Sequence, residues 1–286
     1  MKAQIIKIIS NQYTVMDEFK NKYRCIAMGK LRLDRAPLVG DKVEVIKYQS
    51  DYCIEKIYSR NNELIRPAIA NIDQAIIVMS AVDPDFSTVL VDRIMFLIQL
   101  AHINPIICVT KLDLVDNDHI VYTYIEDYEN SGYRVLCCQK DVADKRIEGI
   151  LSGKITVLTG QSGAGKSTLI NSIDPSFNLI TQEISKALGR GKHTTRHTEL
   201  HEVASGLVAD TPGFSSLDYS SVDKIELSRI INEFKPYIGL CKFRNCLHLN
   251  EPGCSVKMAV NENKISKIRY KNYVDCLELI EKETKK

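Results

Sequence analysis

Residues 156–170 read TVLTGQSGAGKSTLI, an apolar strand that runs into a glycine-containing loop and then into a helix. Residues 160–167, GQSGAGKS, fit the pattern G-x-x-x-x-G-K-[ST]. In such a loop the glycines let backbone N–H groups close around phosphate oxygens. The lysine neutralises the β- and γ-phosphates, and the serine hydroxyl ligates Mg²⁺. The stretch predicts a site for a nucleoside triphosphate with magnesium and leaves the base undetermined. Its predicted contact residues are Gly160, Gln161, Ser162, Gly163, Ala164, Gly165, Lys166, Ser167 (the magnesium ligand) and Thr168.

A second motif, ADTPGF at residues 209–214, follows the apolar stretch GLVA. Asp210 at a strand end can hold Mg²⁺ through water, and the N–H of Gly213 can meet the γ-phosphate. A Pro-Gly turn after any strand is the alternative interpretation. Between the two motifs lies the polar loop SKALGRGKHTTRHTE, in which Thr194 or Thr195 supplies the hydroxyl that a switch loop needs. The sequence does not decide between the two threonines.

The tetrapeptide TKLD, residues 110–113, resembles the guanine-reading motif N/T-K-x-D. Asp113 can accept hydrogen bonds from the N1–H and amino group of guanine, Lys111 can pack along the ring, and Thr110 ends the preceding strand. That strand end is where open α/β sheets bind ligands. The motif comes before the phosphate-binding loop, whereas an ordinary small GTPase has it after. When residues 154–213 are placed before residues 72–152, the motifs stand in the order of an ordinary small GTPase. The sequence therefore predicts a circular permutation.

The segment before the α/β region predicts a small barrel. About five short alternating segments in residues 1–60, such as QYTVMD and DKVEVIKY, are typical of an SH3-like or OB-like fold.

Residues 1–65 carry a net charge of +4, residues 66–220 a net charge of −6, and residues 221–286 a net charge of +4. Basic ends around an acidic middle favour an RNA partner for the ends, with scattered surface charge as the alternative.

A cysteine cluster lies in the stretch CKFRNCLHLNEPGC near the C-terminus. Cys241, Cys246, His248 and Cys254 have the spacing C-x₄-C-x-H-x₅-C and can satisfy a tetrahedral Zn²⁺ without an open position. The site would then be structural. Disulfides are the alternative, and the cellular context weighs against them.

No apolar run reaches the roughly 18 residues of a membrane span, and the N-terminus lacks the features of a signal peptide, so we expect a cytoplasmic protein.

The motif order TKLD, GQSGAGKS, GRGKHTT and DTPG, with a barrel before and a Cys/His cluster after, covers essentially the whole chain. It resembles the circularly permuted ribosome small-subunit-dependent GTPase A family. The resemblance implies late maturation of the 30S subunit, with GTP hydrolysis stimulated by that particle. We expect an OB-like barrel at 1–65, a circularly permuted α/β P-loop GTPase domain at 66–220, and a mainly helical zinc-binding domain at 221–286. The expected protein is a monomer that binds GTP or GDP, the 30S subunit and 16S rRNA, and no membrane.

The catalytic residues are less defined than the binding residues. Ras-like proteins place a glutamine after DTPG to orient water, and Phe214 cannot do this. We hypothesise that His193 on the switch loop completes the site once a partner orders it, and a contact with RNA phosphate is the equal alternative. Cys137 and Cys138 stand where GTPases usually have a serine-rich base loop, so only its backbone is expected to meet guanine. A small-molecule kinase and a GTP-sensing scaffold are the rival functions.

Overall fold

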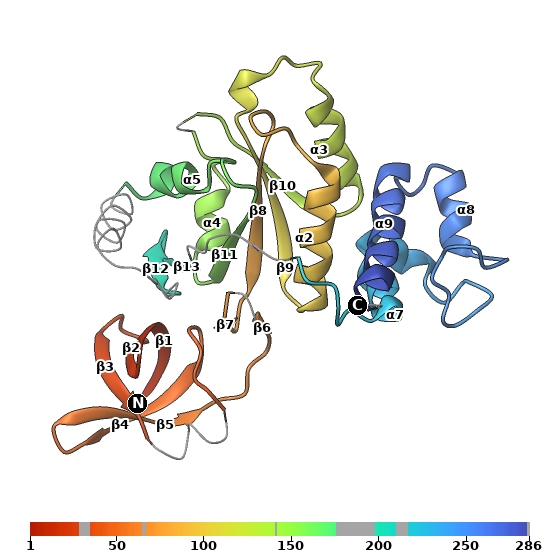
Figure 1. Ribbon diagram of the computed structural model, residues 1–286. Coiled ribbons are helices and arrows are strands. Elements are labelled where there is room, and N and C mark those ends of the chain that lie inside the picture. Colours follow the sequence, from red (N-terminus) through yellow and green to blue (C-terminus); the bar gives the residue numbers. More distant parts are fainter. Residues whose placement is uncertain (29–34, 65–66, 141, 176–197, 210–216, 285–286) are drawn as a thin grey trace. The chain divides into compact units, whose positions relative to one another are not determined.

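The computed structural model describes residues 1–28, 35–64, 67–140, 142–175, 198–209 and 217–284 (Figure 1). The chain divides into two compact units. The first unit takes its residues from 1–75, 145–159 and 166–213, and the second from 76–144, 160–165 and 214–286. Each unit therefore combines three separate parts of the sequence.

The first unit contains the predicted barrel, whose strands are red to orange in Figure 1. The five strands close in the order β1-β2-β3-β5-β4, and β3 runs parallel to β5. A five-stranded Greek-key barrel of this kind is an OB fold, which settles the choice that the sequence left open. The strands are β1 (Lys2–Ile9), β2 (Gln12–Asp17), β3 (Lys22–Ala27), β4 (Lys42–Tyr48) and β5 (Asp51–Ile57). Alternate residues point inward and form a core of Ala3, Ile5, Tyr13, Val15, Cys25, Ala27, Val43, Val45 and Ile54.

The rest of the first unit combines a short hairpin with part of the α/β region. In this part β11 pairs in parallel with β13, and β12 pairs antiparallel with β13. The elements are β6 (Glu63–Leu64), β7 (Ile69–Ala70), α4 (Ile147–Leu151), β11 (Ile155–Gly160), α5 (Lys166–Ile173), β12 (Leu200–Val203) and β13 (Gly206–Ala209). The sequence did not predict β6 and β7, because two-residue strands leave no periodic pattern.

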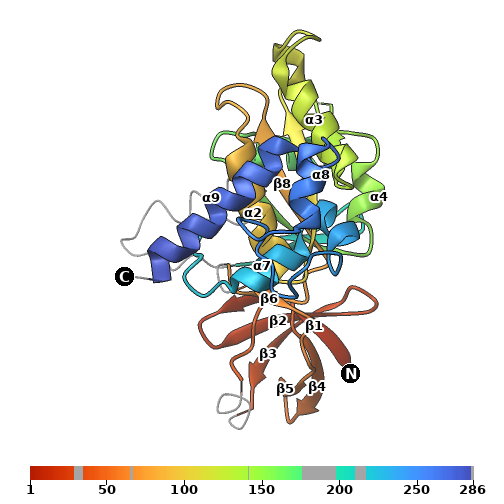
Figure 2. The ribbon, with the colours of Figure 1, turned by 90° about the vertical axis from the view of Figure 1, so that its right-hand side faces the viewer.

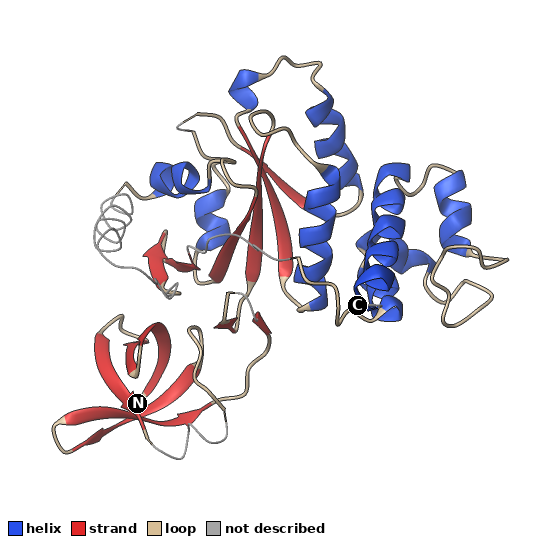
Figure 3. Cartoon of the chain, viewed as in Figure 1, coloured by secondary structure: helices blue, strands red, loops and turns tan. Residues whose placement is uncertain are grey.

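The second unit begins with alternating strands and helices, as the sequence predicts (Figure 3). Its strands lie in the order β10-β9-β8, and β10 is parallel to β9. All seven residues of β8 are buried, which fits a parallel strand covered on both faces. The elements are β8 (Gln74–Ser80), α2 (Thr88–Leu100), β9 (Asn104–Thr110), η1 (Leu112–Leu114), α3 (Ile120–Asn130) and β10 (Arg134–Cys137).

The C-terminal part of the second unit is mainly helical (Figure 2). It consists of α7 (Lys224–Ile230), η2 (Asn232–Tyr237), α8 (Ser255–Asn261) and α9 (Lys267–Thr284). Helix α9 packs on α2, and one core joins Phe96 of α2 with Phe234, Tyr273 and Leu277. The polar C-terminal stretch of the chain belongs to α9 as far as Thr284. No helix in the described part of the chain is long and apolar enough to cross a membrane.

A buried charge network fixes α9 to α2 and to η2. The side chain of Arg269 is 1 % exposed and forms ion pairs with Asp92 and Glu233. Its guanidinium carbon lies 4.7 Å from the ring centres of both Tyr128 and Tyr133, so two aromatic rings enclose the cation. Asp92 also accepts hydrogen bonds from Asn272 at 2.6 Å and from Tyr128 at 3.1 Å. In the cation-rich run KISKIRYKNY, residues 264–273, Arg269 therefore belongs to a packed helix.

Candidate functional site

The phosphate-binding loop connects the end of β11 to the start of α5. Gly160, Gly163 and Gly165 have φ values of +123°, +80° and +86°, a backbone region that residues with a side chain rarely adopt. Such turns direct successive N–H groups toward one side of a loop, where they can meet an anion. Lys166 is the first residue of α5, and the N-terminus of a helix also favours negative charge. The positive φ values of the three glycines and the helix that follows are both features of phosphate-binding loops.

One glycine of the loop is also needed for packing. A Cβ atom at Gly160 would lie 2.0 Å from the carbonyl oxygen of Val78 in β8. No real Cβ contact is that short, and the backbone oxygen cannot move without disturbing its strand.

We expect Gly160→Ala to destabilise the protein by about 2–4 kcal/mol, from overpacking together with the strain of a left-handed backbone. The variant should also bind nucleotide more weakly, because the loop must shift. The matched control is Gly149→Ala in α4, where an added Cβ meets nothing within 4 Å. Thermal denaturation and titration with a fluorescent GTP analogue measure both effects. Equal melting temperatures for the two variants would contradict the argument.

The guanine-reading motif lies at the end of β9, and Thr110 connects it to the phosphate loop. The Thr110 hydroxyl donates a hydrogen bond to the carbonyl oxygen of Ala164 at 2.7 Å. Thr110 is 7 % exposed and Ala164 is fully buried, so the bond is protected from water. The predicted base-reading and phosphate-reading segments are adjacent, although 54 residues separate them in the chain.

The rest of the motif is positioned by two neighbouring loops. Lys111 has a left-handed backbone and donates through Nζ to the carbonyl oxygen of Asp83. Oδ1 of Asp113 accepts a hydrogen bond from the backbone N–H of Lys140 at 2.8 Å. Asp113 is exposed, so its remaining lone pairs face solvent, where a base can reach them.

The loop after β10 shows why cysteines are compatible with this position. The N–H of Cys138 donates to the carbonyl oxygen of Val109 at 2.8 Å, which extends the pairing of β10 with β9. The Cys138 side chain is buried, with its sulfur 3.6 Å from that of Cys108. The hydrogen bond with the Cys138 sulfur, together with burial, raises the pKa of Cys108 well above its usual value, so this thiol stays protonated. Cys138 therefore packs in the core, and its side chain is not available to a base.

Several predicted residues lie outside the described part of the chain: His193, Thr194, Thr195, Asp210, Gly213 and Phe214. Their assignments stay predictions. The flanking strands β12 and β13 are described, and they form an antiparallel hairpin.

The Cys/His cluster comes together in the C-terminal part of the second unit. The four donor atoms of Cys241, Cys246, His248 and Cys254 lie within 4.8 Å of one another. Nδ1 of His248 is 3.7 Å from the sulfur of Cys241 and 3.4 Å from that of Cys254, and these two sulfurs are 4.0 Å apart. Tetrahedral zinc requires about 3.5 Å between sulfur and nitrogen and about 3.8 Å between sulfurs. The cluster can hold a metal ion.

Surrounding groups orient the cluster for a metal. Burial lowers the pKa of His248, which favours the neutral imidazole that binds metals. The Tyr270 hydroxyl donates to the carbonyl oxygen of His248 at 2.6 Å, and Glu251 accepts from the N–H groups of Leu247 and Leu249. Burial raises the pKa of Cys246 to about 12, which a bound cation would reverse.

We expect one metal ion per chain, and its removal should unfold the C-terminal part of the second unit, because Cys246 and Cys254 belong to the core there. Chelation should therefore lower the melting temperature, and a colorimetric metal assay should find one equivalent in the wild type and none in Cys254→Ser. Cys137→Ser, at an exposed cysteine outside the cluster, is the control and should keep its metal. Full metal content in Cys254→Ser would contradict the assignment.

The site and fold define a class of protein: a guanine-reading motif that precedes the phosphate loop is the arrangement of a circularly permuted GTPase. The solved structure of YloQ, described as a circularly permuted GTPase, matches with a TM-score of 0.85 and 39 % identity, covering 98 % of this chain and 95 % of that chain. YjeQ from Thermotoga maritima matches with a TM-score of 0.85 and 31 % identity over 98 % of both chains.

The family models for the RsgA GTPase and for the RsgA N-terminal domain match residues 57–220 and 2–52. The chain belongs to the RsgA GTPase family, and it is a GTP hydrolase. Small ribosomal subunit biogenesis GTPase RsgA 2 of Oceanobacillus iheyensis is 48 % identical over 285 residues, covering 98 % of this chain and 97 % of that protein. Small ribosomal subunit biogenesis GTPase RsgA of Bacillus subtilis is 45 % identical over 287 residues, covering 96 % of both.

Proposed function

We propose that this chain binds the small ribosomal subunit and assists its late maturation, hydrolysing GTP to GDP and phosphate with stimulation by the subunit. The observation that carries the proposal is the hydrogen bond between Thr110 and Ala164. This bond between the TKLD motif and the GQSGAGKS loop supports the proposal, as do relatives that are named for small-subunit biogenesis.

In this proposal the phosphate loop, residues 160–168, binds the phosphates, and Lys166 neutralises the charge that develops during transfer. Ser167 and one of the switch threonines, Thr194 or Thr195, would hold Mg²⁺, with Asp210 acting through water. When bound, that ion adds positive charge beside the phosphate oxygens. Gly213 would meet the γ-phosphate, and His193 would complete the site when the subunit orders its loop.

The chain is proposed to work in three parts, with the barrel at 1–65, the permuted GTPase domain at 66–220 and the metal-binding domain at 221–286. Zn²⁺ is the proposed ion, because three thiolates and one imidazole in a closed set are typical of structural zinc. We further propose a cytoplasmic monomer that contacts 16S rRNA through its basic ends.

Two rival functions remain distinguishable. A small-molecule kinase would need a pocket for an acceptor and would leave the TKLD motif unexplained. A scaffold that only senses GTP would bind nucleotide without turnover.

The test is GTP and ATP turnover by the purified protein, with and without purified 30S subunits. We expect GTP hydrolysis to rise sharply with 30S, ATP to be a poor substrate, and Lys166→Ala to be inactive under both conditions. Equal use of ATP would refute the base assignment. GTP binding without any effect of 30S would refute the ribosomal role.

A further inference from the structure

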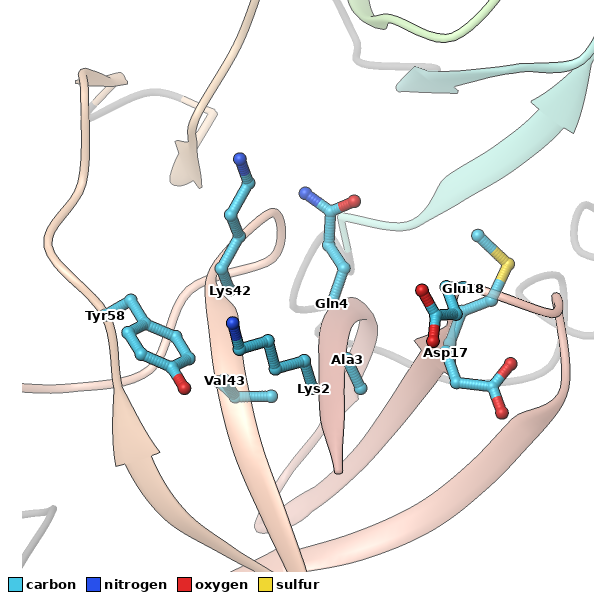
Figure 4. A pocket seen from close by; sticks show the side chains of 9 residues that line it. Lys2, Ala3, Gln4, Asp17, Glu18, Lys42, Val43 and Tyr58 are labelled. Carbon is cyan, nitrogen blue, oxygen red and sulfur yellow. The ribbon is translucent and has the colours of Figure 1, made fainter.

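The barrel carries a hollow of about 380 Å³ whose lining includes Asp17 and Glu18 on one side and Lys2, Lys42 and Tyr58 on the other (Figure 4). The carboxylate of Asp17 already accepts hydrogen bonds from two N–H groups of its own turn. Because the hollow combines charges of both signs, it does not indicate one class of ligand. By contrast, the loop that follows β8 contacts the guanine motif directly.

The loop between β8 and α2, residues 81–87, reaches two segments of the nucleotide site. The carbonyl oxygen of Asp83 accepts a hydrogen bond from Nζ of Lys111. Pro84 lies near the phosphate loop, because a Cβ atom added at Gly163 would be 3.7 Å from its Cδ atom. Since 3.7 Å is an ordinary van der Waals distance, the 81–87 loop lies beside the phosphate loop without pressing on it.

Hydrogen bonds at its start fix the conformation of the 81–87 loop. The N–H of Ala81 donates to the carbonyl oxygen of Thr110 at 2.9 Å. The hydroxyl of Ser80 donates to the carbonyl oxygen of Pro84 at 2.6 Å, and Ser80 is fully buried, so this bond is shielded from water. Asp83 lies between the two bonded positions with a left-handed backbone, φ +47°. The resulting turn directs the carbonyl group of Asp83 toward the guanine motif.

The far end of the 81–87 loop is anchored by other contacts. The ring of Phe86 stacks on that of Tyr124 in α3, with 5.8 Å between ring centres, and meets the ring of Tyr128 edge-on at 6.3 Å. The hydroxyl of Ser87 accepts from the N–H of Leu90 at 3.2 Å and so caps α2. The two ends of the loop can therefore be loosened separately.

The contact with Asp83 matters for binding because Lys111 has a long, flexible side chain. In the proposed function this side chain packs along the guanine ring. A lysine that is fixed by a ligand loses conformational freedom, and that loss weakens binding. The carbonyl oxygen of Asp83 holds the ammonium group before nucleotide arrives, so part of the loss precedes binding. Preorganisation of this kind raises affinity.

We propose that Ser80 is a positioning residue for the guanine base: its hydroxyl holds the turn whose Asp83 carbonyl keeps Lys111 ready to pack along the ring. This inference rests on the proposed function, in which the TKLD motif reads the base. Ser80 acts through Lys111, and the phosphates bind through other groups. Only the part of the affinity that comes from the base should therefore depend on Ser80.

The proposal is tested by calorimetric titration of the full chain with GDP and with pyrophosphate, which has no base. Ser80→Ala should weaken GDP binding about 3- to 10-fold, leave pyrophosphate binding unchanged, and raise KM for GTP while kcat stays within about twofold. The control is Ser87→Ala, which removes the cap of α2 and should lower the melting temperature without weakening GDP binding. Equal losses for GDP and pyrophosphate, or the same GDP loss in Ser87→Ala, would overturn the proposal.

A double-mutant cycle tests whether Lys111 mediates the effect. In the Lys111→Ala background, Ser80→Ala should cost no further GDP affinity, and a fully additive loss there would overturn the mechanism. Asp83→Gly keeps the carbonyl group and suits the left-handed backbone but frees the turn, so it should show the same base-dependent loss. This variant decides the question if Ser80→Ala does not fold, and wild-type GDP affinity in it would then refute the proposal. Stimulation of wild-type GTP hydrolysis by 30S is measured separately, so failure of the positioning role and failure of the proposed function are distinguishable.

Discussion

Asp113→Asn should change the nucleotide preference of the protein from GTP to xanthosine triphosphate. The wild-type carboxylate can accept from both N1–H and the 2-amino group of guanine. An asparagine amide offers one acceptor and one donor, so it opposes the 2-amino group and matches the 2-oxo group of xanthine. Losing charge-assisted hydrogen bonds of this kind costs about 3–6 kcal/mol, which corresponds to about 10²- to 10⁴-fold in GTP affinity.

The structure indicates that this substitution leaves the local fold intact. Oδ1 of Asp113 accepts from the N–H of Lys140, and the amide oxygen of asparagine can accept the same bond. Competition of GTP and xanthosine triphosphate against a fluorescent GDP analogue gives the two affinities, and steady-state turnover gives kcat/KM for each. Asp116→Asn, three residues further on and also exposed, is the matched control and should keep the GTP preference. If Asp113→Asn also kept it, the TKLD motif would not read the base.

Arg269→Ala should be the most damaging single substitution to stability among those considered. It leaves two carboxylates, of Asp92 and Glu233, buried without their cation, and breaking a buried pair in this way costs about 3–5 kcal/mol. A loss of that size lowers the melting temperature by about 6–20 °C. The matched control is Lys271→Ala in the same helix, whose side chain is 72 % exposed and whose ion pair with Asp275 contributes little.

A second substitution identifies the buried charge as the cause. Adding Asp92→Asn to Arg269→Ala should recover part of the loss, because asparagine carries no charge and its one amide oxygen can still accept the hydrogen bond from Asn272. The pH dependence gives an independent check. Burial raises the pKa of Asp92 to about 6 in spite of Arg269, and without the cation it should rise further. The folded variant then binds a proton that the unfolded chain releases, so its stability should fall as the pH rises from 6 to 8. A variant as stable as wild type at pH 8 would rule out this account.

Much of the fold was predictable because each main element carries a local pattern. The barrel strands alternate, the buried strands β8 and β9 are continuous apolar runs, and α5 covers the KSTLINSI stretch that the sequence predicts as a helix. The permutation followed from motif order alone. Short-range patterns could not predict β6 and β7, nor the order of strands that selects the OB fold over the SH3-like alternative, because that order depends on pairing between distant residues.

The sequence predicted some parts of the candidate site and not others. The spacing of Cys241, Cys246, His248 and Cys254 was sufficient to group them, since metal ligands of one closed site often lie close in sequence. The role of Thr110 was not visible, because its partner is a backbone carbonyl 54 residues away. The burial of Arg269 was not predictable either, because nothing in its local sequence distinguishes an arginine that Tyr128 and Tyr133 enclose.

The burial of Arg269 also sets the order in which the chain can complete its fold during synthesis. Asp92 is made 177 residues before Arg269, which corresponds to about 9–35 s of translation. Until Arg269 is made, the carboxylate of Asp92 and the rings of Tyr128 and Tyr133 lack the cation that they contact in the folded protein. The half of the second unit that contains α2 and α3 therefore cannot complete its packing until α9 is made, whereas all strands of the barrel, β1–β5, lie within the first 57 residues. A chain that stops before residue 269 lacks the cation that pairs with Asp92, so we expect its second unit to be less stable than that of the full chain.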